Sequence, residues 1–229
     1  MSAIVGFDTS TNATAVCVVR GDGQAFEHVP DPARLLGRPG HAAELMPALA
    51  RAMDDAAVDW DDVDAIAVGV GPGTFTGLRI GIATARALAQ ARDLELRPVS
   101  SLDALAAGLD RSRARLALID ARRGELFAAL YYEGREDWPP FVASPEEVAE
   151  RVAKAFPGPE RPLAAGDGAI KFRSILEAAG VEVPGDESRL HVVRALSVCR
   201  LAEGSPDTPP EAVLPLYLRD PDAKPQQPR

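Results

Sequence analysis

The chain has 229 residues, 46% of them hydrophobic and 26% charged, a composition that excludes a disordered or fibrous protein and allows one or two compact domains. Its 25 basic and 34 acidic residues give a net charge of −9, which excludes a broad basic surface of the kind that grips nucleic acid unaided. No apolar run reaches the length of about 20 residues that spans a membrane, and the start of the chain lacks the basic and apolar regions of a signal peptide, so we expect a cytoplasmic protein that contacts no membrane.

The first hundred residues predict the element order βββαβαβα. Apolar runs bounded by turn residues predict three consecutive strands and then two more that alternate with helices. A serine can cap the N-terminus of a further helix. The expected strands are 3–8, 13–20, 23–29, 63–70 and 96–99, and the expected helices are 41–56, 74–91 and one that begins at Ser100 or Ser101.

The second half of the chain repeats this order. The segment VGFDTST at 5–11 resembles ALIDARR at 117–123, and AVGVGPG at 67–73 resembles AAGDGAI at 164–170, which favours an internal duplication. The corresponding elements are strands at 116–121, 126–132 and 163–166, a helix that starts at 144–147 and a helix that starts near Ala169.

Two βββαβα lobes that face each other form the α/β architecture of the actin-like ATPase fold, which sugar kinases, Hsp70 and actin share. We expect an N-terminal lobe at 1–100, which carries the helices that bind a partner, and a C-terminal lobe at 101–204. The last 25 residues hold seven of the twenty prolines, and proline at this density opposes helix and sheet. We therefore expect 205–219 to dock back on the first lobe as an extended segment and 220–229 to be a disordered tail.

A nucleotide cleft is the first candidate site. Asp8 and Asp120 end the first strand of each lobe, so both are expected to face the cleft between the lobes. The sequence DTST at 8–11 resembles the first phosphate loop of a sugar kinase, or equally a turn closed by its own side chains. The glycine-rich stretch at 69–81 leads into a helix, where it can hold a phosphate or let two backbones approach closely. The residues of a vestigial nucleotide cleft would be Asp8, Thr9, Thr11, Gly71, Gly73 and Asp120.

The sequence contains none of the common catalytic motifs. Its three histidines are far apart and form no metal-binding pair. A G-x-S-x-G elbow is missing, and the glycine-rich stretch carries Leu78-Arg79 where a Walker A loop has Lys-Ser/Thr. The two cysteines, Cys17 and Cys199, suggest neither a disulfide framework nor a zinc site. We therefore assign no catalytic residue, metal ligand or cofactor.

A stripe of small side chains follows one face of the helix at 74–91. Glycine or alanine recurs every fourth residue there, and such spacing lets a second element approach closely. The neighbour is either the chain's own helix at 41–56 or a helix of a partner chain. Arg79, in the first turn of this helix, is expected to form an ion pair with a nearby carboxylate. The residues expected at a partner interface are His41, Leu45, Leu49, Gly77, Leu78, Gly81, Ala85 and Ala89.

Several motifs in this order resemble one bacterial family. They are FDTST, GRPGHAAELMPAL, VGPGTFTGLRIG, VSSLDALA, IDARRGELFAALY, GDG and PLYLR. Together they are similar to the TsaB (YeaZ) family of tRNA threonylcarbamoyladenosine biosynthesis proteins, which are glycoprotease-like, or M22 peptidase-like. The similarity spans nearly the whole chain. The resemblance implies an actin-like ATPase fold related to the catalytic subunit TsaD, without the H-x-x-x-H metal site of that subunit, in whose place this chain has 99–103.

The resemblance also implies a function and a set of partners. It implies a non-catalytic scaffold that forms a heterodimer with TsaD and recruits the ATPase TsaE, within an assembly that transfers threonylcarbamoyl to an adenosine of tRNA. It implies a homodimer through the same helices when the chain is alone, and contact with tRNA only through the complex. The competing interpretations are an ATP-binding enzyme of the sugar-kinase type, an M22-type peptidase, and a residual nucleotide pocket used for regulation.

Overall fold

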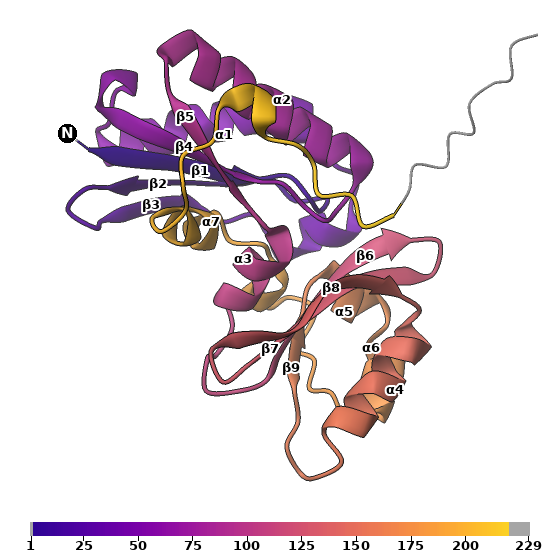
Figure 1. Cartoon of the computed structure of the whole chain (residues 1–229). Helices are drawn as coiled ribbons and strands as arrows, with labels where there is room; N and C mark the ends of the chain where they lie inside the picture. The colour runs from indigo at the N-terminus through magenta and orange to yellow at the C-terminus, as the bar shows by residue number, and fades with distance from the viewer. Residues whose placement is uncertain (1, 220–229) are drawn as a thin grey trace, which may run out of the picture.

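The computed structural model describes residues 2–219. The tail expected at 220–229 lies outside the described residues. Two sheets with helices on their faces form two lobes (Figure 1). No helix within 2–219 is both long enough and apolar enough to cross a membrane.

The first sheet has five strands in the order β3-β2-β1-β4-β5. The first three strands form an antiparallel meander, and the last two run parallel to β1. Parallel strands need long connections, which two helices provide. The strands are β1 (Ala3–Asp8), β2 (Ala15–Arg20), β3 (Ala25–His28), β4 (Val63–Gly69) and β5 (Glu95–Val99).

Helices cover both faces of the first sheet. The side chains of Val5 and Phe7 point to α1 (His41–Ala56) and α2 (Phe75–Arg92) in one core. The opposite face of β1 packs on α7 (Ala195–Ala202), where Gly6 leaves room for the sulfur of Cys199 because a Cβ at Gly6 would collide with it. This alternation follows from the period of two along a strand.

The second sheet has four strands in the order β8-β7-β6-β9. Its strands are β6 (Arg115–Arg122), β7 (Glu125–Tyr132), β8 (Arg135–Ala143) and β9 (Leu163–Ala165), and its helices are α4 (Pro145–Ala155), α5 (Asp167–Lys171) and α6 (Arg173–Ala178). Ser144 and Glu147 form a capping box that starts α4. The helix α3 (Ser101–Ala107) packs on β6 and on α7, and therefore lies between the two lobes (Figure 1).

Four short 3-10 helices complete the described chain. They are η1 (Pro32–Leu36), η2 (Trp60–Asp62), η3 (Arg189–His191) and η4 (Pro210–Ala212). The last belongs to a segment that runs back along the first lobe. There Leu96 and Thr208 exchange backbone hydrogen bonds, the Leu216 N–H donates to the Val70 carbonyl at 2.8 Å, and Val213 is buried in the core.

The predicted fold class is confirmed as an α/β protein of the actin-like type with two mixed sheets. The elements that were not predicted include β8 and α7. The strand β8 carries two prolines, which a strand tolerates at a sheet edge, and β8 is an edge strand. The short helix α7 lies within the range expected for the C-terminal lobe, 101–204, yet it packs on the first sheet. The chain therefore returns to the first lobe before residue 205.

Candidate functional site

Asp8 is the first residue expected in the cleft, and both of its carboxylate oxygens are occupied by neighbouring groups. Oδ1 accepts hydrogen bonds from the backbone N–H of Ser10 at 2.8 Å and from its hydroxyl at 2.6 Å. Oδ2 accepts one from the Ser101 hydroxyl at 2.6 Å. Burial raises the pKa of Asp8, although the bonds from Ser10 and Ser101 act in the opposite direction. The turn at 8–11 is thus closed by its own and neighbouring side chains.

The glycine-rich stretch wraps around this turn. A Cβ at Gly69 would collide with the Asp8 carboxylate, and one at Gly73 would collide with the backbone of Ser10. The N–H of Gly71 donates to the Ser101 hydroxyl at 3.2 Å. The hydroxyl of Thr9 donates to the carbonyl of Gly77 at 2.8 Å. These glycines therefore serve the close approach of backbones, which is one of the two roles that the sequence allows.

Asp120 occupies the corresponding position in the second lobe and is neutralised by two cations. Its side chain is 4% exposed. The ammonium of Lys171 lies 2.9 Å from Oδ1 and 3.0 Å from Oδ2, and Arg122 donates to Oδ2 from Nη1 at 3.0 Å. The backbone N–H of Asp120 donates to Asp167 at 3.0 Å. Burial, with the charge of Asp120, raises the pKa of Asp167 to about 6.

Arg122 also connects the two lobes. Its Nη2 donates to Oδ1 of Asn12 at 2.9 Å, and the amide of Asn12 donates to the carbonyls of Leu35 and Gly37, both at 3.0 Å. A second connection is Arg219, which donates to the carbonyl of Ala121 at 3.3 Å. Ion pairs and hydrogen bonds within the chain thus engage the carboxylates of both Asp8 and Asp120.

The structure brings the predicted cleft residues into two clusters, one around Asp8 with Thr9, Gly71 and Gly73, and one around Asp120. Thr11 is buried, and its hydroxyl accepts from the N–H of Ala13 at 3.3 Å. Nucleotide binding by these residues stays a prediction. Within 2–219, no group of three or more His, Cys, Asp or Glu side chains is arranged to hold a metal ion.

The residues of these clusters that the sequence did not predict include Asn12, Ser101, Arg122, Asp167 and Lys171. The sequence Asp-Ala-Arg at 120–122 is a local signal for one ion pair, because side chains two positions apart on a strand lie on the same face of the sheet. Lys171 carries no such signal, since it is 51 positions from Asp120. Only the packing of α5 against β6 brings these two residues together.

The residues predicted at a partner interface require correction. All of them are buried in the chain's own interior: His41, Leu45, Leu49, Gly77, Leu78, Gly81, Ala85 and Ala89. Leu45 and Ala85 belong to the core over the first sheet, while Cβ atoms at Gly77 or Gly81 would collide with Thr9. The small-residue stripe therefore accommodates the turn after β1 and the sheet, and it forms no outer surface.

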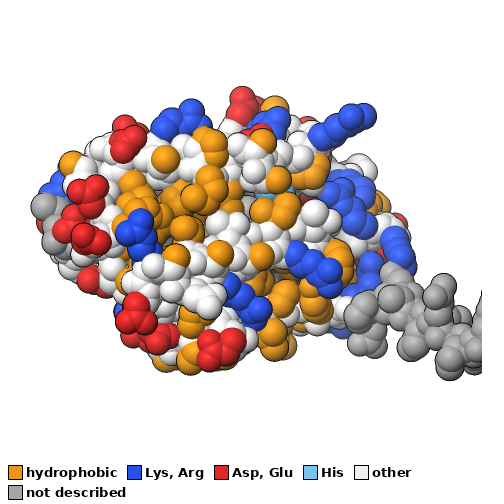
Figure 2. All heavy atoms as spheres, turned by 90° about the horizontal axis from the view of Figure 1, so that it is seen from above, with side chains coloured by type: hydrophobic (Ala, Val, Ile, Leu, Met, Phe, Trp, Pro, Cys, Tyr) orange, Lys and Arg blue, Asp and Glu red, His pale blue; other side chains and the backbone are white. Residues whose placement is uncertain are grey.

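The opposite sides of α1 and α2 are exposed. Alanines occupy much of this exposed face, which we call the α1–α2 face: Ala42, Ala43 and Ala50 on α1, and Ala83, Ala87 and Ala91 on α2. Met46 (47% exposed) and Phe75 (51% exposed) add larger apolar side chains. Figure 2 shows hydrophobic side chains gathered on this side of the molecule, between acidic and basic groups.

Aromatic contacts extend the α1–α2 face to the C-terminal segment. The ring of Phe75 stacks on that of Tyr217, with centroids 5.9 Å apart. The guanidinium of Arg79 lies 3.8 Å from the centroid of Phe75. The prediction that Arg79 pairs with a carboxylate is wrong for the described residues, because the Arg79 guanidinium lies over the ring of Phe75 instead.

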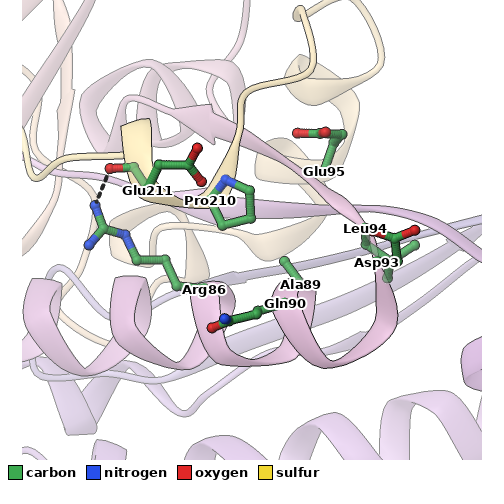
Figure 3. Close-up of a pocket in the computed structure, with 8 residues that line it drawn as sticks. All are labelled: Arg86, Ala89, Gln90, Asp93, Leu94, Glu95, Pro210 and Glu211. Atoms are coloured by element: carbon green, nitrogen blue, oxygen red, sulfur yellow. Dashed lines mark hydrogen bonds between the residues drawn. The ribbon is translucent and has the colours of Figure 1, made fainter.

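A cavity of about 460 Å³ separates the C-terminal end of α2 from η4. Figure 3 shows Arg86 reaching across it from α2, with a hydrogen bond from Nη2 to the carbonyl of Glu211 at 3.1 Å. The same nitrogen donates to the carbonyl of Val213. This arginine is thus an anchor for the C-terminal segment.

Comparisons with known proteins agree with this architecture. The family model of TsaD, tRNA N6-adenosine threonylcarbamoyltransferase, matches residues 36–190. An uncharacterized protein of Mycobacterium tuberculosis is 34% identical over 98% of this chain and 95% of its own length. The tRNA threonylcarbamoyladenosine biosynthesis protein TsaB of Escherichia coli is 33% identical over 65% of this chain and 65% of its own length.

A solved structure also matches nearly the whole chain. YeaZ from Pseudomonas aeruginosa is 30% identical, with a TM-score of 0.77, and the match covers 95% of this chain and 100% of that chain. The resemblance inferred from the motifs is confirmed. The chain belongs to the glycoprotease-like family that includes TsaD and TsaB (YeaZ).

Proposed function

We propose that this chain is a non-catalytic scaffold of TsaB type in the machinery that makes threonylcarbamoyladenosine in tRNA. In this proposal it binds a TsaD-type catalytic subunit through the α1–α2 face, recruits a TsaE-type ATPase to the complex, and leaves tRNA to its partners. When alone it forms a homodimer through the same face. The observation that carries the proposal is this exposed apolar face in a chain similar to TsaB over most of its length.

The bonds that the Asp8 and Asp120 carboxylates form within the chain support a scaffold role rather than ATP hydrolysis. An ATP-hydrolysing site needs acidic oxygens free to hold a metal ion and phosphates. Here three hydrogen bonds from Ser10 and Ser101 occupy Asp8, and Lys171 and Arg122 neutralise Asp120. The net charge of −9 is consistent with a protein whose partner carries most of the contacts with tRNA.

The character of the α1–α2 face supports a helical partner. Small exposed side chains at Ala83 and Ala87 let another helix approach the backbone of α2. Phe75 and Met46 offer the larger apolar side chains that anchor an interface. A two-helix face of this kind can pair either with the related helices of a TsaD-type chain or with a second copy.

The experiment mixes the chain with the TsaD-type protein of the same organism and follows complex formation by size-exclusion chromatography and calorimetry. Ala83→Arg and Ala87→Arg introduce long charged side chains on the exposed side of α2. Each is expected to weaken the heterodimer at least tenfold while the monomer stays folded. Gly81→Arg is unsuitable, because its side chain would collide with Thr9 inside the monomer.

Ala153→Arg is the matched control, because Ala153 is an exposed alanine on α4 of the other lobe. It is expected to leave the heterodimer intact. The purified assembly is then tested for transfer of threonylcarbamoyl to tRNA with and without this chain. A heterodimer that survives Ala83→Arg and Ala87→Arg would contradict the assigned surface, and a rate of transfer independent of the chain would contradict the scaffold.

The enzymatic alternatives are tested on the isolated chain. Titration of Mg-ATP into the wild type and into Asp8→Ala compares their affinities by calorimetry. The scaffold proposal expects no tight binding to either protein. Tight binding that is lost in Asp8→Ala would instead favour an ATP-binding enzyme of the sugar-kinase type.

A further inference from the structure

A second cavity, of about 590 Å³, lies on the side of the first sheet opposite to the α1–α2 face. Its walls come from α3, from the hairpin between β7 and β8, and from α7. Four arginines line it: Arg111, Arg115, Arg135 and Arg200. Two carboxylates, Asp103 and Glu136, lie among the same lining residues, and Arg135 pairs with Asp137. Arg111, Arg115 and Arg200 still outnumber the two carboxylates of the lining, so the cavity carries a local excess of positive charge in a chain that is acidic overall.

Arg115 is the unusual member of this group. It is only 5% exposed, and no carboxylate of the described residues forms an ion pair with it. Nη1 donates to the carbonyl of Ala106 at 3.0 Å, while Nε is buried without a hydrogen-bond partner. The guanidinium carbon lies 5.6 Å from the ring centroid of Tyr131. A buried arginine normally has an anionic partner, because removing an unpaired charge from water is costly.

The surroundings of Arg115 leave its charge uncompensated. Burial lowers the pKa of Arg115, and the charge of Arg111 lowers it further. Asp103 accepts a hydrogen bond from the hydroxyl of Tyr131. Burial and the charge of Asp103 raise the pKa of Glu136. Because Arg111, Arg115 and Arg200 outnumber the two carboxylates of the lining, an anion in the cavity would meet net attraction.

We propose that this arginine-lined cavity binds the phosphate group of a small phosphorylated ligand, of nucleotide size, with Arg115 at its base and Arg111 and Arg200 at its rim. Guanidinium groups match phosphate oxygens with two parallel hydrogen bonds and are the side chains best suited to this ligand. The volume of about 590 Å³ lies within the range of small-molecule sites. Leu196 and Leu201 line one side and offer apolar contact to the remainder of the ligand.

The concave shape favours a small ligand over a polynucleotide. Duplex or folded RNA presents its phosphates on a convex surface, which a hollow walled by three elements does not follow. The site is also separate from the α1–α2 face, so this inference does not depend on the proposed scaffold function. Phosphate binding and heterodimer formation are measured in different experiments and with different variants, so failure of one proposal can be distinguished from failure of the other.

The test titrates pyrophosphate and, separately, ADP without metal into the full chain at low ionic strength, and follows heat by calorimetry. Nitrogen NMR of the arginine Nε–H groups reports the site, because the resonance of Arg115 should move on binding. Arg111→Ala and Arg200→Ala change exposed side chains and are expected to keep the fold. Each should weaken both ligands about tenfold, the usual effect of one charge-assisted hydrogen bond.

Arg151→Ala is the matched control, since Arg151 is an exposed arginine on α4 that lies over Phe141, away from the cavity. It should leave both affinities unchanged. Absence of binding to the wild type would overturn the proposal, as would binding that Arg111→Ala and Arg200→Ala do not weaken. The last titration uses an RNA hairpin without terminal phosphates. Binding of this hairpin that depends on Arg111 and Arg200, with no response to pyrophosphate or ADP, would overturn the small-ligand site in favour of RNA.

Discussion

The hydroxyl of Thr9 donates a 2.8 Å hydrogen bond to the carbonyl of Gly77, and no side chain separates the two backbones. The end of β1 therefore lies directly against the first turn of α2. Gly81 lies one turn further on, and a Cβ there would collide with the same threonine hydroxyl. The glycines of this helix are required by the chain's own packing, which changes what their substitution can test.

Gly77→Ala is expected to destabilise the monomer by about 1–3 kcal/mol, because the added methyl group would overlap the carbonyl of Thr9 and force a backbone shift. Urea denaturation followed by circular dichroism measures the change. Gly158→Ala is the control, since no atom lies within 4 Å of a Cβ placed there. Equal effects of the two substitutions would contradict the close packing at Gly77.

Asp167→Asn is expected to change how stability depends on pH. The folded pKa of Asp167 is raised to about 6 from an ordinary value of 3.8. The folded state therefore binds the proton more tightly than the unfolded state, and the stability that this proton provides is complete below pH 3.8 and is lost as the pH rises to about 6. The difference corresponds to about 3 kcal/mol.

Urea denaturation of wild type and Asp167→Asn at several pH values between 4 and 7 checks this prediction. The asparagine keeps an oxygen that accepts from the N–H of Asp120 and cannot ionise, so the variant should gain stability relative to wild type as the pH rises. Asp55→Asn, on the exposed side of α1, serves as the control. A difference between wild type and Asp167→Asn that does not vary with pH would rule out the raised pKa.

Lys171→Met is expected to destabilise the protein by about 1–2 kcal/mol, because it leaves the buried carboxylate of Asp120 with Arg122 as its only cationic partner among the described residues. The size is modest because the lysine side chain is 40% exposed. In an Asp120→Asn background the same substitution should have little effect. Additive effects in this double-mutant cycle would mean that the ion pair contributes nothing.

Arg86→Ala is expected to loosen the C-terminal segment. The side chain donates to the carbonyls of Glu211 and Val213 across the cavity at the end of α2. Without it, the N–H groups of Thr208 and Leu216, which bond to Leu96 and Val70, should exchange with deuterium faster. Arg92→Ala, on the same helix but over Trp60, should leave these two rates unchanged. Unaltered exchange in Arg86→Ala would show that the segment is held by other contacts.

Local patterns were enough to predict most of the elements. The apolar period of α1 and the turn chemistry around the first three strands define those elements without help from distant residues. The position of Asp8 at the end of β1 was also predictable, because a polar residue that follows an apolar run marks the carboxyl end of a strand. Asp120 lies near the end of β6, which continues to Arg122. The strand β8 was missed because its two prolines interrupt the pattern, and only its edge position makes them tolerable.

The partners of the site residues could not be predicted from the sequence. Arg122 reaches Asn12 across 110 positions, and Ser101 reaches Asp8 across 93. Side-chain type limits which bonds a residue can form, but the packing of the lobes selects among many candidates at this separation. For the same reason, the excess of arginine around Arg115 is invisible in a chain whose net charge is negative.

The sequence alone determined that one face of the helix after the glycine-rich stretch carries small side chains, because glycine or alanine occurs at every fourth residue. Periodicity describes the shape of a surface and carries no information about its neighbour. Only the tertiary structure decided that the turn at Thr9 and the core of the first lobe fill this space. The exposed alanines lie on the other side of α2, which is where we propose that a partner binds.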